Sequence, residues 1–125
     1  MFLRTKQSRR GIYSQLVESY REGGKVKQRV VLYVGHYRTI DEALQRMPRD
    51  VSYRRRRATA LEKQAGLYTI PAGCSEELEE EYRRRLAEAE ARASRAREGA
   101  DDLAHRLEKL RELVSENPSL RSDQH

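Results

Sequence analysis

The sequence contains no tryptophan, one phenylalanine, one cysteine and three prolines in 125 residues. With so few large aromatic side chains, and with hydrophobic residues at only 37% of the chain, a single large core cannot be built. The lone cysteine, Cys74, excludes an internal disulfide and cannot make a cysteine-based metal site by itself. These shortages predict a small domain joined to an elongated helical extension.

Long apolar runs and catalytic motifs are also missing. The first residues, Met1 to Lys6, have no apolar run of signal-peptide length, and no segment approaches the length of a membrane span, so we expect a cytoplasmic protein. The three histidines are scattered, and Gly23-Gly24 lacks the helix and Lys-Ser/Thr pair of a phosphate-binding loop. We therefore expect no enzyme activity, no cofactor and no metal.

Positive charge is concentrated in the first half of the chain. Residues 1–73 carry a net charge of +10 and residues 74–125 a net charge of −4, which together make the +6 of the whole. A basic front half favours a polyanionic partner, above all a nucleic acid. The alternative is a basic surface that only keeps the protein in solution.

Three extended segments open the sequence, at residues 2–6, 12–21 and 25–34. Gly23-Gly24 separates the second from the third, and two glycines suit the positive φ angles of a type I′ hairpin turn. A turn centred there predicts two faces. The first face is nearly all apolar and should pack on a helix; it holds Tyr13, Val17, Val26, Val30, Leu32 and Val34. The second face mixes cations with aromatic rings; it holds Leu16, Glu18, Tyr20, Lys27, Arg29, Val31 and Tyr33.

The second of these faces is the first candidate nucleic-acid surface. Alternating cations on one strand project from one face of a sheet, flanking tyrosines can stack on bases, and arginines in the preceding loop add reach. The residues concerned are Lys25, Lys27 and Arg29, with Tyr20, Tyr33, Arg9 and Arg10. The alternative is that alternating cations only protect an edge strand from aggregation.

Two short helices should follow the sheet. Thr39 and Glu42 form a capping box that starts the first, and Pro48 should end it. Asp50 should cap the second, which runs to about Gly66. It carries the second candidate surface, Arg54, Arg55, Arg56 and Arg57, which suits phosphates but could instead be neutralised by the acidic segment 76–81.

The rest of the chain reads as a linker at residues 67–75, a long charged helix at 76–116 and a frayed tail at 117–125. Ser75 caps the long helix, and glutamates in its first turns suit the helix dipole. Apolar residues recur every three or four positions, which is typical of a coiled-coil seam for a second copy or a partner helix: Tyr82, Leu86, Ala89, Ala93, Ala96, Ala100, Leu103, Leu107, Leu110 and Val114. The alternative is an amphipathic helix that folds back on its own head.

The segment from Leu16 to Gly35 carries a family resemblance. It reads LVESYR, a glycine turn, and then a basic strand ending in RVVLYVG. Over residues 1–37, approximately, the chain resembles the N-terminal region of DDE-type insertion-sequence transposases and of related small bacterial proteins. The resemblance implies a DNA-associated β-sheet head. It does not carry over transposase activity, because the catalytic RNase H-like domain needs far more chain than remains.

Together these patterns predict an α+β protein. A two- to three-stranded antiparallel sheet packs on short helices in a head of residues 1–66, and a long, charged, coiled-coil-like helix follows. The first functional hypothesis is a non-catalytic nucleic-acid-binding module, with DNA favoured, related to a transposase N-terminal domain without the catalytic domain. The second is a coiled-coil protein–protein interaction protein with a basic head.

Overall fold

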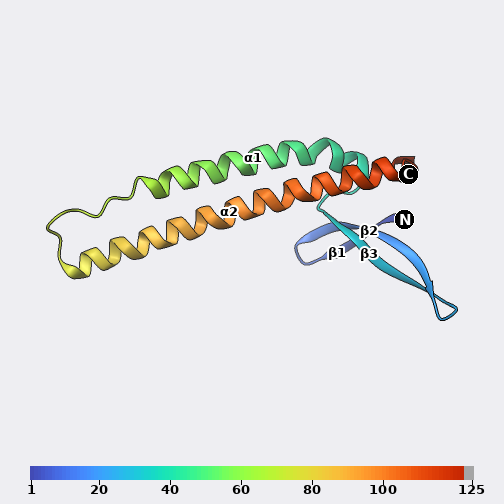
Figure 1. Ribbon diagram of the computed structural model, residues 1–125, viewed down its shortest axis with the longest axis horizontal. Helices are drawn as coiled ribbons and strands as arrows, with labels where there is room; N and C mark the ends of the chain where they lie inside the picture. Colours follow the sequence, from blue (N-terminus) through green and yellow to red (C-terminus); the bar gives the residue numbers. More distant parts are fainter. Residues whose placement is uncertain (123–125) are drawn as a thin grey trace. The chain divides into compact units, whose positions relative to one another are not determined.

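The computed structural model describes residues 1–122, which form two compact units. The first unit comprises residues 1–49 together with those from 104 onward, and the second comprises residues 50–103. The first unit opens with a three-stranded antiparallel sheet in the order β1-β2-β3 (Figure 1). Its strands are β1 (Phe2–Ser8), β2 (Gly11–Glu22) and β3 (Lys25–Gly35). The predicted α+β class and the sheet are confirmed.

The hairpin between β2 and β3 turns at Gly23-Gly24, as predicted. Gly23 and Gly24 have positive φ angles of 60° and 78°, a conformation that residues with a side chain rarely adopt. Glu22 pairs with Lys25 and Arg21 with Val26, so the register next to the turn is the expected one.

Two irregularities in β3 change the register farther from the turn. Leu16 pairs with Leu32 while Val17 pairs with Val30, so Val31 has no partner on β2. Val34 is skipped in the same way, between the partners of Ser14 and Gln15. A bulge of this kind moves the side chains that follow it to the opposite face. The predicted faces are therefore wrong beyond Val30: Leu32 joins the face of Leu16, and Tyr33 leaves it.

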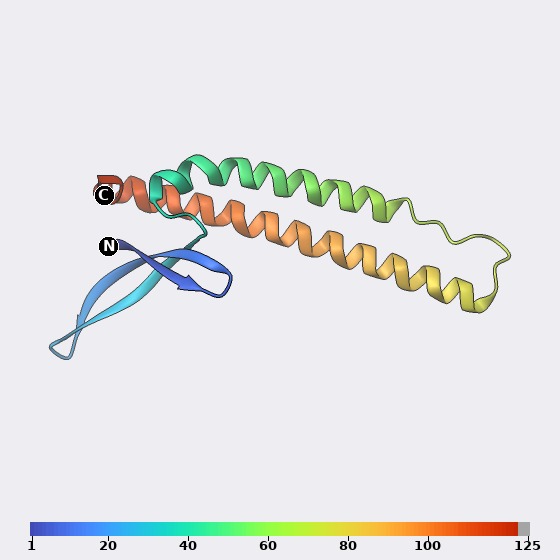
Figure 2. The same ribbon diagram turned by 180° about the vertical axis from the view of Figure 1, so that it is seen from behind.

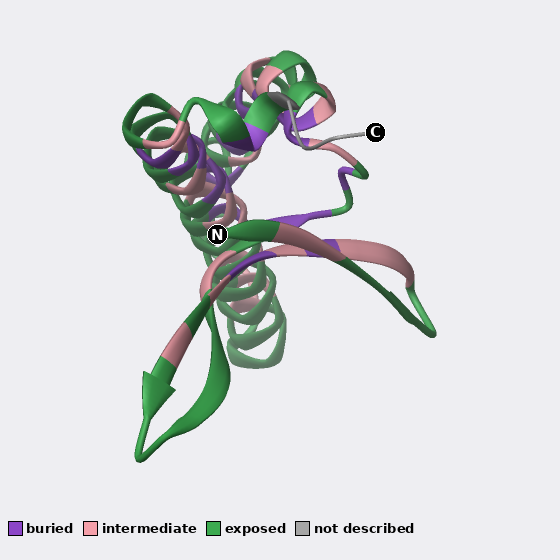
Figure 3. Cartoon of the chain, turned by 90° about the vertical axis from the view of Figure 1, so that its right-hand side faces the viewer, coloured by how far each residue is buried: buried purple, intermediate pink, exposed green. Residues whose placement is uncertain are grey.

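The predicted apolar face is not buried along its whole length, so the expectation that this face packs on a helix is wrong for the half nearest the Gly23-Gly24 turn. Val26 and Val30 are 64% and 47% exposed, whereas Leu16 and Val17, which point to opposite faces, are fully buried (Figure 3). The same unit also buries residues from its helical segments. They are Ile40, Ala43 and Met47, and then Leu107, Leu110, Leu113 and Leu120.

A single helix, α1 (Ile40–Gly66), replaces the two predicted short helices. It begins as predicted, because the Glu42 amide donates to Thr39 Oγ1 at 3.0 Å. Pro48 lies inside it and does not end it, and Asp50 is a helical residue and not a cap. A proline removes one helical hydrogen bond, but Met47 and Val51 on either side of it are both buried, so packing holds the helix through this point.

The predicted long helix is present as α2 (Glu76–Glu116). Ser75 caps it, since the Leu78 amide donates to Ser75 Oγ at 3.3 Å. In the second unit, residues 50–66 of α1 and 76–103 of α2 run antiparallel and lie side by side (Figures 1 and 2). Residues 67–75 between them form no helix or strand.

A short helix, α3 (Ser119–Ser122), follows α2, where the sequence predicts a frayed tail. Leu120 is 2% exposed, and Arg121 Nε donates to Asp41 Oδ1 at 2.7 Å, so this turn is held within the first unit. The rest of the predicted tail, residues 123–125, lies outside the described residues. No helix among residues 1–122 is long and apolar enough to cross a membrane.

Candidate nucleic-acid interface

The structure brings four of the predicted contact residues together on one face of the hairpin. Cross-strand partners share a face, and Tyr20 pairs with Lys27 and Glu18 with Arg29. Lys25 lies two residues before Lys27 and so projects from the same face. The three cations are exposed, and Tyr20 is half-buried.

Two of these cations already have carboxylate partners. Arg29 forms an ion pair with Glu18, and its guanidinium lies 5.0 Å from the centre of the Tyr20 ring. Lys27 Nζ lies 3.4 Å from Glu22 Oε2. The face is therefore less positive than the sequence alone suggests. Exposed ion pairs of this kind contribute about 0–1 kcal/mol, so an incoming phosphate can compete for either cation at little cost.

Tyr33 does not join this face, because the bulge at Val31 turns it away. Its ring lies 5.8 Å from that of Tyr13, and the guanidinium of Arg106 lies 5.0 Å from its centre. The last two residues of the first candidate surface, Arg9 and Arg10, are exposed in the turn between β1 and β2. Nothing in the sequence pattern predicted the approach of Arg106, which comes from a segment more than seventy residues away.

The four consecutive arginines lie on α1 in the second unit, and all are exposed. They divide between two hollows. Arg54 and Arg57 line one of about 320 Å³, called here the Tyr53 hollow, together with Tyr53 and with Arg95, Ala96 and Gly99 of α2. Arg55 and Arg56 line another of about 400 Å³ with Thr59, Ala60 and Lys63. Residues three apart on a helix lie on one side of it, which explains why Arg54 and Arg57 share a hollow.

Sequence reasoning missed Arg95 and Lys63. Lys63 follows Arg56 by seven residues, or about two helical turns, so helical spacing alone could have found it. Arg95 could not be found that way, because only the pairing of α1 with α2 brings it to the arginine run.

The acidic start of α2 does not neutralise the arginine run in this structure. Glu79 and Glu81 instead accept hydrogen bonds from Arg83 and Arg85, one helical turn along, at 2.6 and 2.7 Å. Within residues 1–122, no ion pair joins any residue of 54–57 to a carboxylate. All four arginines are therefore exposed and without an ion-pair partner among the described residues.

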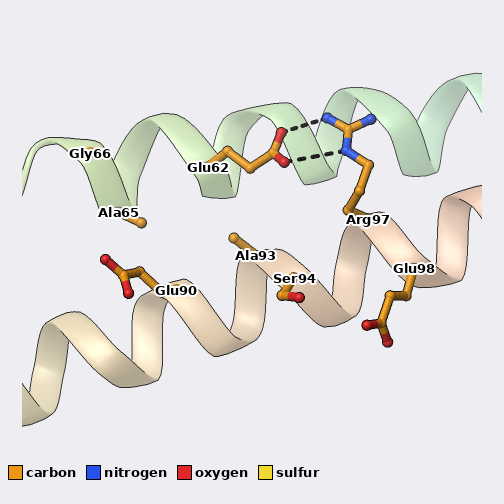
Figure 4. A pocket seen from close by; sticks show the side chains of 8 residues that line it. All are labelled: Glu62, Ala65, Gly66, Glu90, Ala93, Ser94, Arg97 and Glu98. Atoms are coloured by element: carbon orange, nitrogen blue, oxygen red, sulfur yellow. Dashed lines mark hydrogen bonds and ion pairs between the residues drawn. The ribbon is translucent and has the colours of Figure 1, made fainter.

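Another hollow of the second unit, of about 490 Å³, is lined by both charged and small residues, and two of them, Glu62 and Arg97, form an ion pair (Figure 4). Arg97 Nη2 donates to Glu62 Oε1 at 2.5 Å and to Thr59 Oγ1 at 3.0 Å, which ties α2 to α1. The hydrogen bond from Arg97 lowers the pKa of Glu62 below its ordinary value. In Figure 4, Ala65 of α1 and Ala93 of α2 point toward one another. We interpret this region as helix packing.

The residues of the predicted seam are all at least half-buried. Ala93, Ala100, Leu103, Leu107 and Leu110 are buried, and Tyr82, Leu86, Ala89, Ala96 and Val114 are half-buried. The seam is thus largely covered within one chain.

No group of three or more metal-ligating side chains occurs in the described part of the chain. No curated protein and no solved structure matches the sequence. Residues 3–65, which contain all of the sheet except Phe2 as well as the hairpin face and the arginine run, match the family model described as IS1634 family transposase, N-terminal domain. Because that match spans half of the chain, this protein belongs to the family of IS1634 transposase N-terminal domains.

Proposed function

We propose that this chain is a non-catalytic nucleic-acid-binding module, with DNA the favoured partner. The observation that carries the proposal is the arginine run, residues 54–57. All four side chains are exposed, and none has a carboxylate partner within residues 1–122. A guanidinium forks a phosphate with two parallel hydrogen bonds, and this is the partner that best satisfies such a cluster.

The hairpin face provides a second set of phosphate contacts. Lys25 is exposed, and Lys27 and Arg29 are held only by solvent-exposed ion pairs. Exchanging those carboxylates for phosphates keeps each cation paired, while the released Glu18 and Glu22 return to water. The hairpin face should therefore contribute less per cation than the arginine run.

Fluorescence anisotropy with labelled mixed-sequence duplex DNA, across a series of salt concentrations, tests the proposal. Each neutralised phosphate contributes about −0.9 to the slope of log affinity against log salt, so four arginine contacts should give about −3.6. Replacing residues 54–57 by glutamine should make the slope shallower by about that amount and leave the smaller contribution of the hairpin face. The matched pair Lys27→Ala with Arg29→Ala should remove less than two contacts' worth. Absence of binding at low salt, or a slope unchanged by both sets of changes, would contradict the proposal.

The alternative, a protein that pairs with another chain through the seam of α2, has less support. The side chains that would form such a contact are already half-buried or buried within one chain. Sedimentation distinguishes the two functions, because pairing through the seam predicts a mass that rises with protein concentration.

A further inference from the structure

The Tyr53 hollow concentrates positive charge that comes from two helices. Arg54 and Arg57 approach from α1, and Arg95 approaches from α2. No aspartate or glutamate lines this hollow, in contrast to the hollow of about 490 Å³, where Glu62, Glu90 and Glu98 accompany Arg97. Like charges that line one hollow with no carboxylate in the lining repel one another, so an anion bound in the hollow relieves that repulsion and is attracted by each arginine that reaches it.

The α2 side of this hollow is lined by small residues. Ala96 is half-buried, and Gly99 has no side chain. A Cβ placed on Gly99 would meet no atom within 4 Å, so the space above that residue is open. The hollow measures about 320 Å³, which is within the range of roughly 300–1,000 Å³ typical of small-ligand pockets.

One exposed aromatic side chain lines the same hollow as the arginines. Tyr53 is 58% exposed and is the one aromatic residue among the lining side chains. Aromatic rings next to cationic grooves are a feature of single-strand binding, because unpaired bases stack on them, whereas bases within a duplex are already stacked on one another.

We propose that the Tyr53 hollow binds one phosphate group of single-stranded nucleic acid, with the adjacent unpaired base stacked on Tyr53. This proposal rests on the proposed function: if the protein binds nucleic acid, the Tyr53 hollow is the place where it binds a single strand. Arg54, Arg57 and Arg95 hold the phosphate, and Ala96 and Gly99 leave room for it.

The chain supplies a matched control for the arginines. Arg54→Ala with Arg57→Ala removes two charges from the Tyr53 hollow, and Arg55→Ala with Arg56→Ala removes two charges of the same run from the other hollow. Anisotropy with a labelled oligothymidine and with a duplex of the same length measures both. We expect the first pair to weaken single-strand binding at least about tenfold more than the second. We expect both pairs to weaken duplex binding alike, as a loss of general charge does.

The aromatic contact has its own control. Tyr53→Leu should weaken oligothymidine binding by roughly 5- to 150-fold, the range for losing one stacked base. Tyr68→Leu, at an exposed tyrosine in the linker, should leave it unchanged. Duplex affinity should stay unchanged for both variants.

Filling the hollow tests the site without removing any charge. Gly99→Leu places a side chain in the open space, and Ala91→Leu adds a large side chain at an exposed position of the same helix. Only the first should weaken oligothymidine binding, while circular dichroism shows both variants to be folded. Inorganic phosphate should compete weakly with the oligonucleotide, and thymidine monophosphate should compete better.

Equal losses from the two arginine pairs, together with no effect of Tyr53→Leu, would overturn the proposed site but leave nucleic-acid binding standing. The absence of wild-type binding to duplex and single strands alike would remove the proposed function as well.

Discussion

Gly35 and Gly99 differ in backbone conformation, and this difference determines whether an added side chain lowers or raises the stability of the fold. Gly35, at the end of β3, has a φ of 108°, where L side chains are strained, and a Cβ there would lie 3.3 Å from Arg106 Nη1. Gly99 is an ordinary helical residue with open space around it. A glycine within a helix costs stability because its backbone loses more freedom on folding than that of alanine.

The same substitution should therefore have opposite effects at the two sites. Gly35→Ala should lower the free energy of unfolding by about 1–3 kcal/mol, because the backbone is forced into a disfavoured region. Gly99→Ala should raise it by about 0.5–1 kcal/mol. Urea unfolding followed by circular dichroism measures both, and a shift of the same sign in the two variants would contradict this account.

The stability of the folded chain depends on pH through Glu42, which lies in the first turn of α1. Its carboxylate accepts a hydrogen bond from the Arg38 amide at 2.9 Å and another from Arg46 at 2.7 Å, and these lower its pKa below the ordinary value of 4.5. A group whose pKa is lower in the folded state stabilises the fold above its unfolded pKa. That contribution is lost as the pH falls from about 4.5 through the lowered value.

Glu42→Gln should consequently flatten the fall in stability on the acid side of pH 4.5. Thermal melts of the variant and wild type should converge as the pH decreases through that range and differ most at neutral pH. Glu108→Gln, at an exposed glutamate for which no ion pair is found within residues 1–122, serves as the control. If the two variants follow the same pH profile, Glu42 has no special part in acid unfolding.

At the scale of elements, Pro48 shows tertiary packing overriding a local rule. The residue lacks the amide hydrogen that would bond to Leu44, yet α1 continues from Ile40 to Gly66. Buried residues on both sides of Pro48 favour the helix more than the proline disfavours it.

Pro48→Ala should restore the missing hydrogen bond and raise the free energy of unfolding by about 1–3 kcal/mol, with part of the gain offset by a more flexible unfolded chain. Differential scanning calorimetry should show a higher Tm. Pro71→Ala, in the linker, is the control and should change Tm little. A lower Tm for Pro48→Ala would mean that the proline stabilises the helix it interrupts.

For the whole molecule, two leucines of the predicted seam of α2 lie in the core of the first unit. Leu107 is 5% exposed and Leu110 is fully buried within the first unit. Their packing therefore contributes to the stability of the folded chain.

Leu107→Asn should lower the free energy of unfolding by at least about 2 kcal/mol, since it removes buried apolar volume and buries an amide. Analytical ultracentrifugation should show the same mass for the variant and wild type. A normal melt combined with a reduced mass would instead support association with a second chain.

Local physical chemistry determined much of this protein from its sequence. The Gly23-Gly24 turn, the caps at Thr39 and Ser75, and the 76–116 helix depend on residues within a few positions of one another, and all are present. The resemblance of the hairpin to transposase N-terminal regions was likewise carried by one short segment, and the family match confirmed it.

Only the tertiary structure decided what depends on distant residues. The bulge that turns Tyr33 away depends on how β2 and β3 pair, and Arg95 reaches the hollow of Arg54 and Arg57 only because α1 and α2 lie side by side. The helix continues through Pro48 where residues on both sides of the proline are buried. Burial of apolar area is non-directional and is shared by many residues at once, so no local pattern specifies which ones it brings together. For that reason the sequence could name the arginine run but could not show that Arg95 lines the same hollow as Arg54 and Arg57.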